Sequence, residues 1–244
     1  MFDRRILSFF AVLVLFATAA VTFATSTAET ANEQKKKAAV VTPLNIAILI
    51  QDDLISQVSN ELDVTRDFIR SLPAGSRVMI GYIRSGSLQT RQPFTTDLDK
   101  AARSLRIPLS STSASPFNPY VEVVDALRKF DSRWKGINAV LLISDGLDTS
   151  RGFDSTAAGY TLDLNRAIAE ANDRNVAVYA FYAPSVGLTS RSRLAASYGQ
   201  SSLNRLANET GGRAFFQGTT GFVSFDSHFR RLKETLNAQF ARAS

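Results

Sequence analysis

The stretch NIAILIQDDLIS, Asn45–Ser56, decides how the rest of the chain is interpreted. Its uninterrupted apolar run, residues 46–50, is typical of a strand that is buried on both faces of a sheet. The run stops at Gln51, Asp52 and Asp53. These two carboxylates either end a buried strand by reaching solvent or lie at a ligand site on the edge of a sheet.

Strand-like and helix-like segments alternate from Leu44 onward. Apolar runs predict the strands, and apolar side chains at three- and four-residue spacing predict the helices between them. The predicted strands are 44–50, 77–83, 88–94, 138–144, 176–183 and 213–216, and the predicted helices are 57–72, 97–105, 120–130, 161–175, 201–212 and a last helix carrying 222–240. This alternation indicates an α/β fold with one open, mostly parallel sheet, helices on both faces and one antiparallel edge strand, 88–94.

Composition excludes several kinds of site. The 244 residues include no cysteine and one histidine, His228, so disulfides, thiolate metal sites, cysteine nucleophiles and imidazole cages are excluded. The formal charge of +6 comes from bases and acids that are scattered along the chain, and we expect no nucleic-acid partner. A Ser-His-Asp triad would need His228, and the sequence has no Gly-x-Ser-x-Gly motif. We therefore expect His228 to be an exposed surface residue.

Residues 1–28 predict export. A short basic start, MFDRR, precedes an uncharged run over 6–24, which is the pattern of an export signal. The same run is long enough to span a bilayer as an uncleaved anchor. Cleavage would give a secreted or periplasmic protein, and retention would give a membrane-anchored one facing outside the cytoplasm. Residues 29–43 predict a polar linker, and 44–244 predict the folded domain.

Acidic side chains follow two of the predicted strands. Asp52 and Asp53 come after 44–50, and Asp145 lies in the loop after 138–144. Ligands of open α/β sheets bind beyond the carboxyl ends of the strands, so we expect the two clusters to converge. Carboxylates and hydroxyls without imidazole or thiolate suit Mg²⁺, Mn²⁺ or Ca²⁺. The alternative is that these aspartates cap strands and accept hydrogen bonds from loop amides.

Three segments carry a resemblance to a known family. LLISDGLDT, 141–149, resembles the fourth-strand signature of von Willebrand factor type A (VWA) domains, in which a strand ends in aspartate and glycine. LNRLANETGGRAFF, 203–216, is similar to the closing helix and strand of that family, and DFIRSLPAGSRVMIGYI, 67–83, to its first helix and second strand. The resemblance covers most of 44–240 and implies a Rossmann-like VWA fold.

The resemblance also implies a metal-ion-dependent adhesion site (MIDAS). That site uses Asp-x-Ser-x-Ser after the first strand, a threonine from a middle loop and the aspartate after the fourth strand, which Asp145 matches. The first motif is degenerate in both registers, Asp52-x-Leu54-x-Ser56 and Gln51-x-Asp53-x-Ile55, and the middle loop offers Thr112, Ser113 or Ser115. The predicted ligand-binding residues are Asp52, Asp53, Ser56, Thr112, Ser113 and Asp145, with Asp52, Asp53 and Asp145 as the candidate metal ligands.

These observations predict an exported VWA-like module that binds a protein partner at the carboxyl-end loops, with a divalent cation as a candidate cofactor. Two alternatives stay open. One is a metal-dependent phosphohydrolase with Asp52 or Asp53 as nucleophile and Asp145 as metal ligand. No phosphate-clamping motif accompanies these residues, so we expect no enzyme. The other is a membrane-tethered structural component of an envelope assembly.

Overall fold

A computed structural model describes residues 43–134, 136–153, 161–216 and 223–243. The predicted export signal and nearly all of the predicted linker lie outside these residues. Within them, no helix combines the length and the apolar character needed to cross a membrane.

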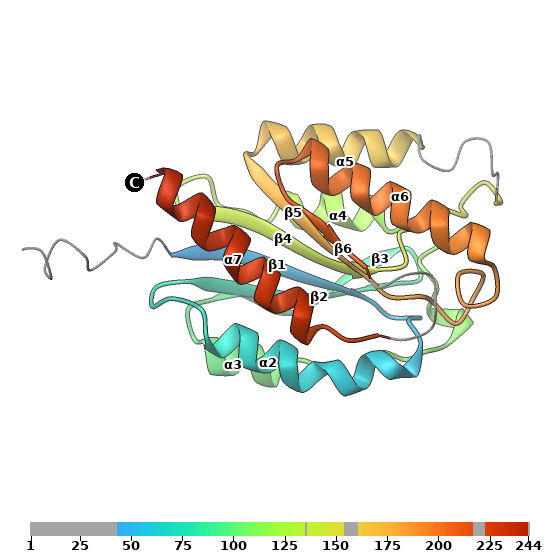
Figure 1. The fold of residues 1–244 in the computed structure, drawn as a ribbon, viewed down its shortest axis with the longest axis horizontal. Coiled ribbons are helices and arrows are strands. Elements are labelled where there is room, and N and C mark those ends of the chain that lie inside the picture. The colour runs from blue at the N-terminus through green and yellow to red at the C-terminus, as the bar shows by residue number, and fades with distance from the viewer. Residues whose placement is uncertain (1–42, 135, 154–160, 217–222, 244) are drawn as a thin grey trace, which may run out of the picture. The chain divides into compact units, whose positions relative to one another are not determined.

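One six-stranded sheet forms the centre of the domain, in the order β3-β2-β1-β4-β5-β6 (Figure 1). Its strands are β1 (Leu44–Gln51), β2 (Arg77–Arg84), β3 (Ser87–Thr95), β4 (Ile137–Ser144), β5 (Val176–Tyr182) and β6 (Ala214–Phe215). All neighbours are parallel except β2 and β3, which form an antiparallel pair at one edge. The predicted fold class is therefore confirmed.

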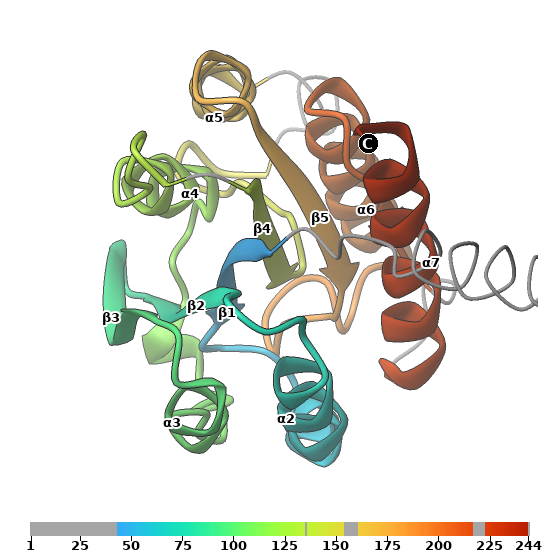
Figure 2. The same ribbon diagram turned by 90° about the vertical axis from the view of Figure 1, so that its left-hand side faces the viewer.

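Helices cover both faces of the sheet (Figure 2). On one face lie α2 (Leu62–Arg70), α3 (Leu98–Arg103) and α7 (Asp226–Ala243), and on the other lie α4 (Tyr120–Leu127), α5 (Leu162–Asp173) and α6 (Arg193–Glu209). All eight residues of β1 are buried, because the strand is central and covered on both sides. Alternate residues of β1 enter the two cores, with Ile48 in one and Leu49 in the other.

Two predicted helices differ from the observed ones. The segment 57–72 forms a 3₁₀ turn, η1 (Ser56–Glu61), before α2. Helix α6 begins at Arg193, earlier than the predicted 201, because the side chain of Ser192 accepts a hydrogen bond from the Ala195 amide and caps the helix.

The expectation that His228 is exposed is wrong. Its side chain is buried in α7, with ring centroids 5.1 Å from Phe181 and 5.8 Å from Phe215. His228 lies three residues after Phe225, and such residues share one face of a helix. Burial lowers the pKa of the imidazole to about 4.

Candidate functional site

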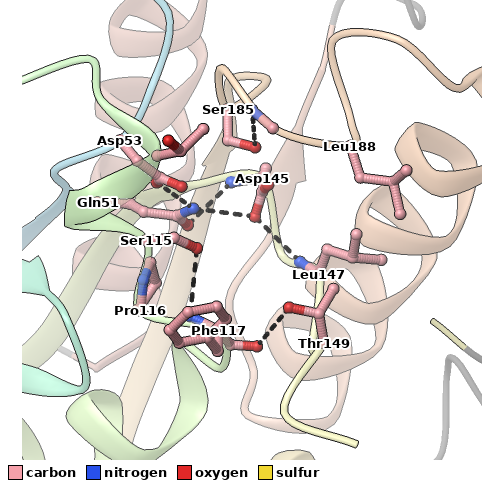
Figure 3. Close-up of a pocket in the computed structure, with 12 residues that line it drawn as sticks. Gln51, Asp53, Ser115, Pro116, Phe117, Asp145, Leu147, Thr149, Ser185 and Leu188 are labelled. Atoms are coloured by element: carbon pink, nitrogen blue, oxygen red, sulfur yellow. Dashed lines mark hydrogen bonds between the residues drawn. The ribbon is translucent and has the colours of Figure 1, made fainter. Parts of the chain in front are cut away.

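A cavity of about 210 Å³ opens beyond the carboxyl ends of β1 and β4 (Figure 3). The two strands are neighbours, with Ile50 paired to Ile143, so the residues that follow them meet at one edge of the sheet. The lining comes from β1, the segment before α4, and the loops after β4 and β5: Gln51, Asp53, Thr112, Ser115, Pro116, Phe117, Asp145, Leu147, Thr149, Ser185, Gly187 and Leu188.

The carboxamide of Gln51 lies between two carboxylates (Figure 3). Its Nε2 donates to Oδ1 of Asp53 at 2.7 Å and to Oδ1 of Asp145 at 3.2 Å. Its Oε1 accepts from Ser144 Oγ at 2.5 Å and from the Asp145 amide at 3.3 Å. Because a backbone amide can only donate, the atom facing it must be the oxygen. The nitrogen of Gln51 therefore faces the two acids.

Asp145 is held by several donors. Its Oδ1 accepts from the Leu147 amide at 3.2 Å, and its Oδ2 accepts from Thr189 Oγ1 at 3.0 Å. The backbone of α6 also approaches closely, because a Cβ on Gly199 would lie 1.9 Å from the Asp145 carbonyl oxygen. Only glycine permits this contact, so Gly199 fixes the distance between α6 and the loop that carries Asp145.

Both acids of the cavity have raised pKa values. Burial raises the pKa of Asp145, and burial together with the nearby charge of Asp145 raises the pKa of Asp53 from 3.8 to about 6. Within the described residues, neither carboxylate forms an ion pair. Two buried carboxylates are thus held by neutral donors alone.

The structure brings together only some of the predicted site residues. Asp53, Asp145 and Thr112 line the cavity. Ser56 is exposed at the start of η1, and Ser113 binds Ser85 and Ser111 outside the lining. Of the two registers for the degenerate motif, the one that begins at Gln51 places its first two members, Gln51 and Asp53, beside Asp145.

Asp52 does not join the acidic pair. Its two carboxylate oxygens accept from Nη1 and Nη2 of Arg106 at 2.6 and 2.7 Å, and its side chain is fully buried. The guanidinium of Arg106 in turn stacks on the ring of Tyr82, 3.9 Å from the centroid, and the Leu109 amide donates to Asp52 Oδ1 at 3.0 Å. Asp52 therefore fixes the segment before α4 and is a structural residue.

The hydroxyl groups after β5 are not among the site residues predicted from the sequence. Thr189 binds Asp145 directly, and Ser185 shares a hydrogen bond with Thr189 at 3.1 Å. A signal for them was present, because β5 follows β4 in the predicted sheet and its carboxyl-end loop contains several hydroxyl residues.

The residues do not fit a MIDAS cation. A cation between Asp53 and Asp145 would have to displace the Gln51 nitrogen, and turning the amide over would set its NH₂ group against the Asp145 amide donor. Ile55, at the third motif position, offers no ligand atom and packs against the core. Among the described residues, no group of three acidic or histidine side chains could hold a metal ion.

Exposed large apolar side chains of the described residues gather at the same edge of the sheet. They belong to the segment before α4, to the loops after β4 and β5, to the first residues of α4, α5 and α6, and to the end of β6: Ile107, Leu109, Phe117, Val121, Phe153, Leu162, Leu188, Leu194 and Phe216. Phe117 and Leu188 line the cavity itself. We call these residues the apolar rim.

The sheet order and the helices on both faces together define a VWA-like α/β fold. Structures with this fold include the conserved hypothetical protein BatB from Bacteroides thetaiotaomicron, with a TM-score of 0.56 and 17% identity over 82% of this chain and 99% of that chain. An aerotolerance-related membrane protein from Bacteroides fragilis gives a TM-score of 0.51 and 14% identity over 80% of this chain and 99% of that one.

A third structure, a von Willebrand factor type A protein from Catenulispora acidiphila, has a TM-score of 0.50 and 15% identity, over 80% of this chain and 42% of that chain. At such identities the likeness establishes the fold alone. No family model matches the sequence, and no curated protein matches it.

Proposed function

We propose that this chain is a protein-binding module that engages its partner through the apolar rim and the cavity, without a divalent cation. The apolar rim carries the proposal. Exposed apolar side chains that gather around one cavity are typical of a protein interaction site, whereas scattered ones are ordinary. In an open α/β sheet, the carboxyl edge is also where ligands bind.

The chemistry of the cavity favours binding over catalysis. A phosphohydrolase that used Asp53 as nucleophile would need cations to bind the phosphate, and among the described residues no lysine or arginine lines this cavity. Two carboxylates that lack a cation would repel an anionic substrate. We therefore propose that the chain is not an enzyme, and that Asp53 and Asp145 contribute to recognition.

We further propose that the domain acts outside the cytoplasm. The uncharged run 6–24 after a basic start supports this location, and the Bacteroides fragilis structure with the same fold is that of a membrane protein. Cell fractionation with sequencing of the mature N-terminus tests it. An intact Met1 in the membrane fraction would indicate an anchor, a start near Glu29 would indicate cleavage, and a cytoplasmic protein would refute export.

Site-specific photocrosslinking in the native cells tests the binding surface. A benzoylphenylalanine at Phe117 or Leu188 is expected to give a covalent adduct with a protein of defined mass. The same group at Lys129 or Arg174, exposed residues near the opposite edge of the sheet, serves as the matched control and should give none. Equal adducts from both edges, or turnover of a phosphate ester by the purified chain, would contradict the proposed function.

A further inference from the structure

We propose that the partner inserts one basic side chain, a lysine or an arginine flanked by apolar residues, into the cavity beside Asp53 and Asp145. This inference rests on the proposed function and names the chemistry of the partner. A MIDAS cation would instead join the domain to an acidic residue of its partner.

The charges of the cavity determine the sign of the partner group. Asp53 and Asp145 are 2% and 4% exposed, and the neutral amide of Gln51 donates to both of them. Three exposed arginines lie near the cavity, Arg151 and Arg191 in loops and Arg193 at the start of α6, and none of them pairs with either acid. An acidic partner residue would be repelled here, whereas a basic one would find two carboxylates.

The state of Asp53 supports the same conclusion. Burial and the charge of Asp145 raise the pKa of Asp53 to about 6, so the ionised form of Asp53 destabilises the folded protein at neutral pH. A cationic group that enters the cavity removes that destabilisation, because opposite charges at close range favour the ionised form. The free domain is thus arranged to gain from a cation that it does not supply itself.

The size and walls of the cavity indicate a single side chain as the occupant. Its volume of about 210 Å³ is below the roughly 300–1,000 Å³ of typical small-molecule pockets. Phe117, Leu147 and Leu188 line it together with the two acids. Lysine and arginine suit such walls, since their methylene stems pack on apolar surface while their charged ends bind carboxylates. The apolar rim would then contact the flanking residues of the partner.

The test is selection of a random peptide library, displayed on phage, on the full chain in mild detergent. Wild type, Asp53→Asn, Phe117→Ser and Asp173→Asn are used in parallel, in EDTA and again in Mg²⁺. Asp173 is the charge-matched control, because it is exposed at the end of α5 near the opposite edge. Asp53→Asn keeps an oxygen that can accept from Gln51, so we expect it to fold, and a thermal melt confirms this.

We expect wild type and Asp173→Asn to enrich peptides with a lysine or arginine between apolar residues, in EDTA as well as in Mg²⁺. These peptides should bind Asp53→Asn at least tenfold more weakly, because the buried charge pair is lost. The peptides should also bind Phe117→Ser more weakly than they bind the wild type. Replacing the basic peptide residue by norleucine should reproduce the loss seen with Asp53→Asn.

Two results would overturn the inference and leave the proposed function standing. One is enrichment of peptides that need Phe117 but bind wild type and Asp53→Asn equally. The other is enrichment of acidic peptides that need Phe117 and bind in EDTA as well as in Mg²⁺. Acidic peptides that bind only in Mg²⁺ would contradict the proposed function too, because it involves no divalent cation. If no enriched peptide depends on Phe117, the proposed function fails together with the inference.

Discussion

Replacing Asp53 by asparagine is expected to stabilise the folded protein at neutral pH. The folded-state pKa of Asp53 is about 6, against 3.8 for the ordinary side chain. Each unit of difference corresponds to about 1.4 kcal/mol, so ionised Asp53 lowers the free energy of unfolding by about 3 kcal/mol. Asparagine keeps the acceptor for Gln51 but forms weaker hydrogen bonds than a carboxylate, which offsets about 1 kcal/mol of the gain.

The net gain of about 2 kcal/mol corresponds to an increase in Tm of about 4–8 °C for a domain of this size. The pH dependence follows from the sign of the shift. Because the folded-state pKa is raised, the contribution of Asp53 to the stability of the wild type is fully present below about pH 4 and is lost as the pH rises through about 6. The advantage of Asp53→Asn should therefore be largest above pH 7 and should shrink towards pH 4.

The assay is a set of thermal and urea melts of the wild type, Asp53→Asn and Asp173→Asn between pH 4 and pH 8. Titration of His228 affects all three proteins equally and cancels in the differences. We expect Asp173→Asn to follow the wild type throughout. A variant that is no more stable than the wild type at pH 7.5, or whose advantage is the same at every pH, would show that Asp53 is not held at a cost in the cavity.

Three further predictions concern other groups. Arg106→Gln should lower the free energy of unfolding by about 3 kcal/mol in urea melts, because Asp52 is left buried without its partner. Arg70 forms exposed ion pairs, so the control Arg70→Gln should lower the free energy of unfolding by less than about 1 kcal/mol. His228→Phe should have a higher Tm than the wild type near pH 4 but not at pH 7.5. The folded-state pKa of His228 is lowered to about 4, so the wild type loses stability as the pH falls from about 6.5 through 4. If Tm falls equally with pH in the two proteins, the result would contradict a buried His228. Gln51→Asp should lower Tm in EDTA, and Mg²⁺ should restore it, since an ion selective for the folded state stabilises that state. The wild type should have the same Tm in EDTA and in Mg²⁺. A change in the wild-type Tm on adding Mg²⁺ would contradict our assignment of the Gln51 nitrogen.

Much of the fold could be predicted from local sequence patterns. The buried run 46–50 and the alternating segments identified a mostly parallel sheet, because apolar periodicity reflects which faces are covered. The start of α6 could not be predicted in the same way. Gly199 normally weakens a helix, yet here it permits the close approach of the Asp145 carbonyl. That contact joins segments far apart in the sequence and leaves no local signal.

The candidate site shows the same limit. Sequence spacing placed acids at the carboxyl ends of β1 and β4, and the structure brings Asp53 and Asp145 together there. It could not distinguish Asp53 from Asp52, because the choice depends on which side of the strand end faces β4. The partner that identifies Asp52 as structural is Arg106, 54 residues away. The buried position of His228 likewise depends on Phe181 and Phe215, which belong to other elements.

The two adjacent aspartates at the end of β1 differ in their side-chain partners, while their main-chain carbonyls both fix loops around the cavity. Asp52 accepts from the Ser110 amide through its carbonyl at 3.0 Å, and Asp53 accepts from the Val186 amide in the same way at 2.9 Å. One short segment thus holds the loops before α4 and after β5 on either side of the cavity. Asp52 can be buried because Arg106 neutralises it. Asp53 is buried among fixed loops and pairs with no cation among the described residues. In the proposed complex, a basic group of the partner would therefore relieve the destabilisation that its ionisation causes.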